Sequence, residues 1–252
     1  MNPFDLRGKT MVVTGGTNGI GKGLVEYFAR QGVLVAAVGS SEKSAEQTKQ
    51  DMADLGMSIS VYHADLRKVE NIQPLFDDIV REFGRIDILV NCAGMGNPMP
   101  AVEVTQKDWD EMMDLNVRAT FFCSQAAARH MLPRKYGRII NMTSQLSVVA
   151  NENEAVYCAS KGAINNMTRA LSYEWSREGV IVSAVAPTFA YTPGTAERLD
   201  NPAFRDGVLS RIPRGRLGTL NDVGAAVQYL ASDQADMASG AVLFIDGGWT
   251  IV

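Results

Sequence analysis

Short apolar runs recur along this chain, with longer amphipathic stretches between them. Most of the runs are continuous rather than alternating, which is typical of strands that are covered on both faces of a parallel sheet. We expect strands at 11–14, 34–38, 59–63, 86–90, 138–142, 180–186 and 241–246. Seven such strands with helices between them predict an α/β protein, a doubly wound parallel sheet with helices on both faces.

The stretches between the runs have the period of amphipathic helices. Ile20, Leu24 and Phe28 recur every four residues, and similar apolar faces extend over 109–122 and 163–175. Glycines stand at 32, 56, 84 and 179, where helices must end before a strand. The proline-containing segment at about 188–218 is predicted to be irregular and is a candidate substrate lid. We expect one domain over residues 1–252.

Composition and charge narrow the function further. The chain has 252 residues, of which 46% are hydrophobic, so a full-sized core is possible. A formal net charge of -4 argues against nucleic acid or an anionic membrane as a partner, because both are polyanions. Three widely spaced cysteines without a His/Cys cluster predict reduced thiols and no metal. No apolar run approaches the ~20 residues of a membrane helix, so we expect a cytoplasmic protein.

A glycine-rich segment follows the first predicted strand. Residues 14–21 read TGGTNGIG and lead directly into a helix. Glycines at such a turn let the backbone approach a pyrophosphate, which the free N–H groups of the helix N-terminus also favour. An ordinary βα turn can have this composition, but the position after the first strand favours a dinucleotide site. The predicted contacts here are Gly15, Thr17, Asn18, Gly19, Ile20 and Gly21.

Further motifs follow the later strands. The sequence NCAG stands at 91–94 after the fourth strand, and DGGW stands at 246–249. Tyr157 and Lys161 form the only YxxxK in the chain, and Ser144 precedes Tyr157 by thirteen residues. Asn116 lies in the middle of a predicted helix. Together with the TGxxxGxG spacing, these residues resemble the short-chain dehydrogenase/reductase family over about residues 6–249.

The resemblance implies a Rossmann domain and a reversible NAD(P)-dependent oxidoreductase that acts on CH–OH groups. It implies that Asn116, Ser144, Tyr157 and Lys161 are catalytic, and that Asn116 holds a water linking Lys161 to solvent. The implied nucleotide contacts are Asp65, Leu66, Asn91, Ala93, Gly94, Tyr157, Lys161, Pro187 and Thr192. It also implies self-association through the long helices over 109–122 and 163–175, as a homotetramer or a homodimer.

Tyr157 and Lys161 are four residues apart, so on a helix they share one face and their side chains can interact. Electrostatics then shows what the lysine can do for the phenol. A free phenol has a pKa of about 10, so a base near pH 7 needs a shift of about 3 units, or roughly 4 kcal/mol. A cation about 4 Å away supplies that much at an effective dielectric constant of about 20. Desolvation opposes the shift, and a positively charged nicotinamide would have to help. Without Ser144 and Asn116, a surface tyrosine beside a solvated lysine would be the simpler interpretation.

The end of the second predicted strand bears on the choice between NAD and NADP. An acidic residue there binds a ribose 2′-hydroxyl, whereas a basic residue accepts a 2′-phosphate. Gly39 occupies the usual place of the acid, so no carboxylate repels a phosphate. Ser40, Ser41 and Lys43 offer hydroxyls and a cation. These residues favour NADP and leave NAD open.

Substrate contacts are expected from Met95, Gln145, Glu154 and Phe189, and from the lid. Amides and carboxylates around a pocket suit a polyhydroxylated substrate, whose buried hydroxyls need partners, so we expect a sugar, a sugar acid or a polyol. Glu154 could equally be a solvated residue at a helix N-terminus. Thr188 replaces the glycine usual in the family, a strained choice if this position needs a positive φ.

Other functions are compatible with these motifs. A 3-oxoacyl carrier-protein reductase or general carbonyl reductase would share them, but an acidic carrier needs a basic surface. Arg134, Lys135 and Arg138 supply only a small cluster, which we interpret as a solvated helix end. A non-catalytic dinucleotide-sensing protein would need only the glycine segment, so the complete catalytic set weighs against it. An enoyl reductase is disfavoured, because its tyrosine–lysine spacing is wider.

Overall fold

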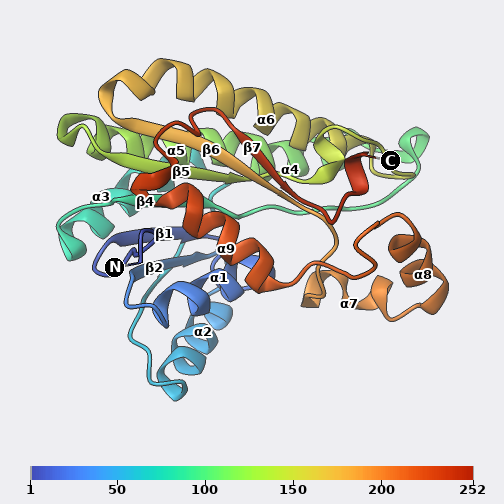
Figure 1. The fold of residues 1–252 in the computed structure, drawn as a ribbon, viewed down its shortest axis with the longest axis horizontal. Coiled ribbons are helices and arrows are strands. Elements are labelled where there is room, and N and C mark those ends of the chain that lie inside the picture. Colours follow the sequence, from blue (N-terminus) through green and yellow to red (C-terminus); the bar gives the residue numbers. More distant parts are fainter. Residues whose placement is uncertain (1, 252) are drawn as a thin grey trace.

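The predicted parallel sheet is present in the computed structural model, which describes residues 2–251. Its strands pair in the order β3-β2-β1-β4-β5-β6-β7 (Figure 1). They are β1 (Thr10–Thr14), β2 (Leu34–Gly39), β3 (Ser60–His63), β4 (Ile88–Asn91), β5 (Gly137–Met142), β6 (Val180–Pro187) and β7 (Val242–Ile245). All seven predicted strands are confirmed within two residues at either end. Because β1 pairs with both β2 and β4, the strand order reverses beside β1, where dinucleotides bind in such sheets.

Helices cover both faces of the sheet, as predicted (Figure 1). Phe28 and Val227 belong to the core under one group of helices, and Phe76 and Trp175 belong to the core under the other. The first group is α1 (Gly19–Ala29), α2 (Glu42–Asp54) and α9 (Leu220–Ala231), and the second is α3 (Ile72–Phe83), α5 (Ala119–Met131) and α6 (Ala155–Trp175). The glycines at 32, 56, 84 and 179 have φ between 75° and 80°, a backbone conformation that favours glycine. The predicted turns at these four positions are therefore confirmed.

The apolar pattern over 109–122 does not form one continuous α-helix. The structure divides it into α4 (Gln106–Met113) and α5, with a π-helical turn over Asp114–Arg118 between them. Asn116 lies in this turn, and π-helical turns are frequent at functional sites. No helix within residues 2–251 is both long and apolar enough to cross a membrane.

The segment 188–218 is not irregular, contrary to the prediction. It contains α7 (Pro193–Leu199) and α8 (Pro202–Ser210). Their prolines stand at the first helical position, where the missing N–H would have no helical partner, so they begin helices rather than break them. Thr188 has no positive φ, and its N–H donates to the carbonyl oxygen of Ile245 at 3.1 Å, so the threonine fits this backbone without strain.

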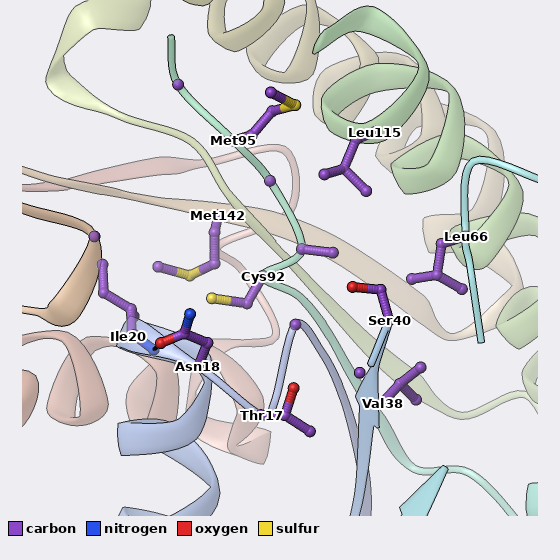
Figure 2. A pocket seen from close by; sticks show the side chains of 18 of the residues that line it. Thr17, Asn18, Ile20, Val38, Ser40, Leu66, Cys92, Met95, Leu115 and Met142 are labelled. Carbon is purple, nitrogen blue, oxygen red and sulfur yellow. Dashed lines mark hydrogen bonds between the residues drawn. The ribbon is translucent and has the colours of Figure 1, made fainter. Parts of the chain in front are cut away.

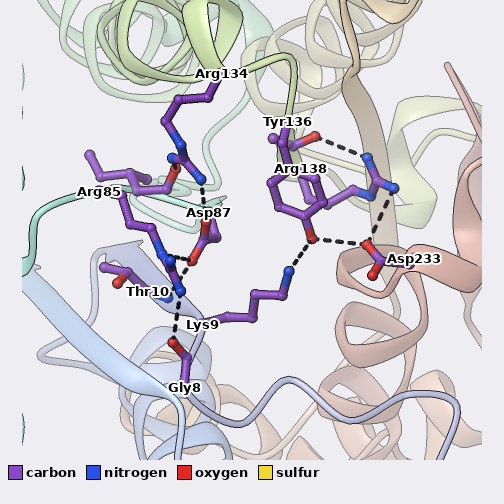
Figure 3. Close-up of polar contacts among 11 residues, drawn as sticks. Gly8, Lys9, Thr10, Arg85, Asp87, Arg134, Tyr136, Arg138 and Asp233 are labelled. Atoms are coloured by element: carbon purple, nitrogen blue, oxygen red, sulfur yellow. Dashed lines mark hydrogen bonds and ion pairs between the residues drawn. The ribbon is translucent and has the colours of Figure 1, made fainter.

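A polar network lies at the amino ends of the strands, opposite the ends that bind ligands (Figure 3). Its centre is Asp87, which is 2% exposed. The Asp87 carboxylate accepts from the Thr10 N–H at 3.0 Å, from Arg85 at 3.0 Å and from Arg134 at 2.6 Å. These bonds tie β1 to the start of β4.

The basic cluster at 134–138 is therefore not a solvated helix end, which corrects the prediction. Arg134 pairs with Asp87, and Arg138 is buried and pairs with Asp236 at 3.2 Å. Lys135 is exposed. Two of the three cations thus belong to internal ion pairs and offer little charge to an acidic partner.

Candidate active site

Two adjoining cavities lie at the carboxyl ends of the strands, where ligands of such sheets bind. The larger has a volume of about 530 Å³ and extends from the glycine segment to Tyr157 and Lys161. The smaller, of about 250 Å³, is lined by Ser144, Glu154 and residues that follow β6. Tyr157 lines both cavities, so its side chain stands at their junction.

Most of the predicted nucleotide residues line the larger cavity. Figure 2 shows Asn18 and Ile20 on one side of it, and Ser40 and Leu66 on the other. The predicted residues in its lining are Gly15, Thr17, Asn18, Gly19, Ile20, Gly21, Ser40, Asp65, Leu66, Ala93, Gly94, Tyr157, Lys161, Pro187 and Thr192. The predicted substrate residue Met95 also lines this cavity rather than the smaller one.

The glycine segment has the shape that a pyrophosphate requires. Gly15 has φ of 66°, and a Cβ there would lie 2.9 Å from the backbone nitrogen of Ala93. A Cβ on Gly21 would lie 2.2 Å from the carbonyl oxygen of Gly15. Only glycine fits these two positions, and the N-terminus of α1 directly follows the turn. The residues present therefore fit a bound dinucleotide.

Two predicted nucleotide residues lie outside the cavity lining. Ser41 caps the N-terminus of α2, where its hydroxyl accepts from the Ser44 N–H at 3.4 Å. Asn91 is buried at the end of β4, and its Nδ2 donates to Ser124 Oγ and Asn141 Oδ1, both at 2.9 Å. Asn91 therefore connects neighbouring elements beneath the cavity, a role that its place in the motif does not reveal.

Thr17 and Gly39 meet at the end of β2. A Cβ on Gly39 would lie 2.4 Å from Thr17 Oγ1, so Thr17 occupies the space that a side chain at 39 would need. The Thr17 hydroxyl lies 3.2 Å from Ser44 Oγ. Of the three residues predicted to bind a 2′-phosphate, Ser40 lines the cavity, and Ser41 and Lys43 do not.

Arg67 also lines the larger cavity, although it was not predicted from the sequence as a site residue. Its guanidinium pairs with Asp65, with Nε 2.9 Å from Oδ1, and hydrogen bonds from Arg67 lower the pKa of Asp65. The available signal was a basic residue two positions after Asp65, an implied nucleotide contact. The ion pair with Asp65 holds the Arg67 guanidinium at the wall of the cavity that is formed by the residues after β3.

Tyr157 and Lys161 share one face of α6, as predicted, and both line the larger cavity. Lys161 Nζ lies 5.4 Å from the centre of the Tyr157 ring and donates to the carbonyl oxygen of Met142 at 2.9 Å. Burial raises the pKa of Tyr157 to about 12, and burial lowers the pKa of Lys161 to about 8. In the protein alone, desolvation therefore outweighs the opposing hydrogen bond from Ser144, and the phenol keeps its proton at neutral pH.

Ser144 follows β5 and lines the smaller cavity with Gln145. Its hydroxyl donates to Gln145 Oε1 at 3.2 Å and accepts from the Leu146 N–H at 3.2 Å. Ser144 also acts to lower the pKa of Tyr157, against the effect of burial. A hydroxyl oriented in this way can bind a substrate oxygen beside the phenol.

Asn116 does not line either cavity but shapes the wall of the larger one. Its Oδ1 accepts from the Met95 N–H at 2.8 Å, and its Nδ2 donates to the Met95 carbonyl oxygen at 2.9 Å. A Cβ on Gly94 would lie 3.1 Å from Asn116 Oδ1 and 3.6 Å from Lys161 Nζ. Asn116 and Lys161 therefore flank Gly94. A water between them stays a prediction.

The smaller cavity contains the predicted substrate residues Gln145, Glu154 and Phe189. Glu154 is not solvated, because it is 5% exposed and its Oε1 accepts from Arg198 Nη1 at 3.2 Å. Burial raises the pKa of Glu154, and Arg198 opposes this effect. Arg198 was predicted only as part of the lid. Its pairing joins α7 to the residue before α6, which local sequence does not show.

Comparisons with known proteins agree with this geometry. Residues 15–250 match the family model described as Enoyl-(Acyl carrier protein) reductase. The chain is 37% identical to the 2-dehydro-3-deoxy-D-gluconate 5-dehydrogenase of Escherichia coli (strain K12), over 99% of this chain and 98% of that protein. It is also 37% identical to the D-threitol dehydrogenase of Mycolicibacterium smegmatis, over 98% and 95%.

Solved structures of dehydrogenases are also similar to this chain. A gluconate 5-dehydrogenase from Burkholderia cenocepacia J2315, in complex with NADP and tartrate, superimposes with a TM-score of 0.95 at 32% identity. The match covers 100% of this chain and 98% of that one. The matched residues therefore include those of the sheet, those that line the two cavities and the segment that contains α7 and α8.

Proposed function

This chain belongs to the short-chain dehydrogenase/reductase family, and on that premise we propose that it interconverts a secondary alcohol and a ketone of a sugar, sugar acid or polyol, with NAD(P) as the cofactor. The observation that carries the proposal is the position of Tyr157. Its phenol stands where a cavity suited to a dinucleotide meets a smaller polar cavity. A substrate in the smaller cavity can thus receive a proton at the place where the nucleotide ends.

The chain supplies the proton and the alignment for this reaction. A bound nicotinamide gives or accepts the hydride. In reduction, Tyr157 donates its proton to the substrate oxygen as that oxygen becomes an alkoxide, and Ser144 holds the same oxygen by a hydrogen bond. In oxidation, Tyr157 takes the hydroxyl proton. The nearby Lys161 ammonium stabilises the phenolate, which burial alone disfavours.

NADP is the expected cofactor, because Thr17 fills the space beside Gly39 and no carboxylate faces a 2′-phosphate there. Ser40 contributes a hydroxyl to this end of the cavity, and Arg67 contributes a guanidinium that Asp65 partly neutralises. Titration of protein fluorescence with NADPH and NADH at one stated ionic strength tests the preference. Tighter binding of NADH by tenfold would overturn it.

The proposed reaction is tested with a panel of polyols, sugars and aldonates in the presence of NADP⁺ or NAD⁺. Nucleotide reduction is followed at about 340 nm, and turnover of at least one of these alcohols is expected. Nucleotide binding without turnover of any alcohol or ketone would instead indicate a dinucleotide sensor. A 3-oxoacyl carrier-protein reductase is less well supported, because Arg134 and Arg138 are engaged in internal ion pairs.

Self-association is expected through α4 and α6. Trp109 on α4 is 44% exposed, and Tyr173 on α6 is 89% exposed. Large apolar side chains at such exposure favour burial in an interface. A homotetramer or homodimer is the expected state, and light scattering coupled to size-exclusion chromatography measures it.

A further inference from the structure

The smaller cavity, hereafter the alcohol cavity, is lined by one anion and one cation among the described residues. They are Glu154 and Arg198, whose side chains pair with each other. The remaining polar lining consists of hydroxyls and an amide, including Ser144, Gln145 and Thr188. The net charge of the lining is therefore zero when the pair is ionised.

Arg198 is held in place by more than its charge. Its guanidinium lies 4.6 Å from the centre of the Phe204 ring and 5.8 Å from that of Phe189. Aromatic faces attract a cation at such distances. Glu154 and the two rings hold the Arg198 guanidinium in place. Arg198 is therefore not an unpaired cation that is available to bind an anionic ligand.

Glu154 is equally constrained. It follows Asn153, which has φ of 61°, and the Asn153 carbonyl oxygen accepts from the Met99 N–H at 2.9 Å. Glu154 is 5% exposed, and Arg198 is its ion-pair partner within residues 2–251. Removing the partner of a buried charge is strongly unfavourable. A substrate carboxylate would have to displace Glu154 from Arg198 or share the cavity with it.

The same cavity offers unused hydrogen-bonding capacity to a hydroxyl. Thr188 is 7% exposed, and its Oγ1 has no hydrogen-bond partner among the described residues. Buried polar atoms without a partner are uncommon and call for a ligand or water. Thr188 lines the cavity, so a small rotation of its side chain would let a substrate hydroxyl pair with the buried Oγ1, while another substrate hydroxyl donates to the Glu154 carboxylate.

Given the proposed function, we infer that the alcohol cavity selects neutral polyols over sugar acids, with Glu154 and Thr188 as specificity-determining residues. The relatives named above include both acid and polyol dehydrogenases, so their names do not decide between the classes. The preference for polyols depends on Glu154, which neutralises Arg198 and repels a second carboxylate. The same carboxylate accepts a hydrogen bond from a substrate hydroxyl.

The first test uses the unaltered enzyme and matched substrate pairs. D-threitol and D-threonate, xylitol and xylonate, and glucitol and gluconate have equal chain lengths and differ in one terminal carboxylate. We expect the polyol of each active pair to have the higher kcat/KM by about tenfold or more, which corresponds to at least ~1.4 kcal/mol. Equal or faster turnover of the acids overturns the inference and leaves the proposed function intact. No turnover of any pair, with turnover of a sugar, overturns the inference alone, whereas no turnover of any alcohol in the wider panel overturns the proposed function as well.

Variants then assign the selection to residues. Glu154→Gln leaves the Arg198 charge without its partner, so the kcat/KM ratio of acid to polyol should rise by about tenfold or more. Glu152→Gln is the matched control, because Glu152 is exposed on the same loop and does not line the cavity, and its ratio should not change. Equal ratios in both variants would overturn the role of Glu154. Binding of NADPH verifies that each variant is folded, because Glu154 does not line the larger cavity.

Thr188→Val tests the hydroxyl separately. Loss of one hydrogen bond should raise KM for the preferred polyol by about 3- to 10-fold with little effect on NADPH binding. An unchanged KM would show that Thr188 does not contact the substrate.

Discussion

Replacing Tyr157 with phenylalanine removes one oxygen atom at the junction of the two cavities. The ring should keep its position, because it packs beside Gly96, where a Cβ would lie 3.5 Å from the ring, and near Lys161 Nζ at 5.4 Å from its centre. The substitution therefore separates proton transfer from packing. Because burial raises the pKa of Tyr157 to about 12, the native phenol is protonated at neutral pH and able to act as the acid in ketone reduction.

The size of the effect follows from what the oxygen does. A positioned general acid contributes about 10²- to 10⁴-fold to the rate, or about 3–5 kcal/mol of barrier. In nucleotide binding, the hydroxyl can contribute at most one hydrogen bond, about 0.5–1.5 kcal/mol, so Kd should rise no more than about 12-fold. Tyr157→Phe should thus lose nearly all turnover and retain most of its affinity for the nucleotide.

The assay is the steady-state kcat/KM for ketone reduction, combined with an NADPH titration of the same preparation. Tyr229→Phe is the matched control, because Tyr229 is 38% exposed on α9 and lines neither cavity, and it should leave both quantities unchanged. If Tyr157→Phe keeps more than about a tenth of the activity, the barrier has changed by less than ~1.4 kcal/mol, and Tyr157 is not the acid or base.

Four further outcomes follow from the packing and the charges. Gly39→Asp should weaken NADPH binding by tenfold or more, because the new side chain meets Thr17 and its charge opposes a phosphate; unchanged affinity would contradict this. Gly21→Ala should abolish nucleotide binding, since its Cβ would lie 2.2 Å from a carbonyl oxygen, whereas Gly207→Ala, with open space, should not. Burial lowers the pKa of Lys161 to about 8 from 10.5, so the unfolded chain binds more protons between these values. The stability of the wild type relative to Lys161→Met should therefore rise with pH across that window, by up to about 3 kcal/mol in urea unfolding. Asp87→Asn should cost about 3 kcal/mol of unfolding free energy without changing Kd for NADPH.

The sheet and most residues that line the larger cavity could be predicted because their signals are local. A strand buried on both faces is a continuous apolar run, and the tight turn between Gly15 and Gly21 requires glycine at fixed positions. Tyr157 and Lys161 were found because they are one helical turn apart on α6. Each of these features is determined by neighbours in the sequence.

The features that were missed depend on contacts between distant segments. Glu154 and Arg198 are 44 residues apart, and neither position alone reveals that they pair. Asn91 matched a nucleotide motif, but its partners on α5 and β5 place it beneath the cavity instead. The prolines of 188–218 indicated an irregular loop, yet Pro193 begins a helix there. Only the packed structure distinguishes these possibilities.

The short helix α7 has a consequence for how this enzyme can change over evolution. Thr192 and Gly194, at its start, line both the nucleotide cavity and the alcohol cavity. A substitution there changes the lining of both cavities at once, so a better fit in one cavity risks a worse fit in the other. Glu154 and Thr188 line the alcohol cavity alone. The smaller cavity can therefore change through these two positions while the lining of the larger cavity stays the same.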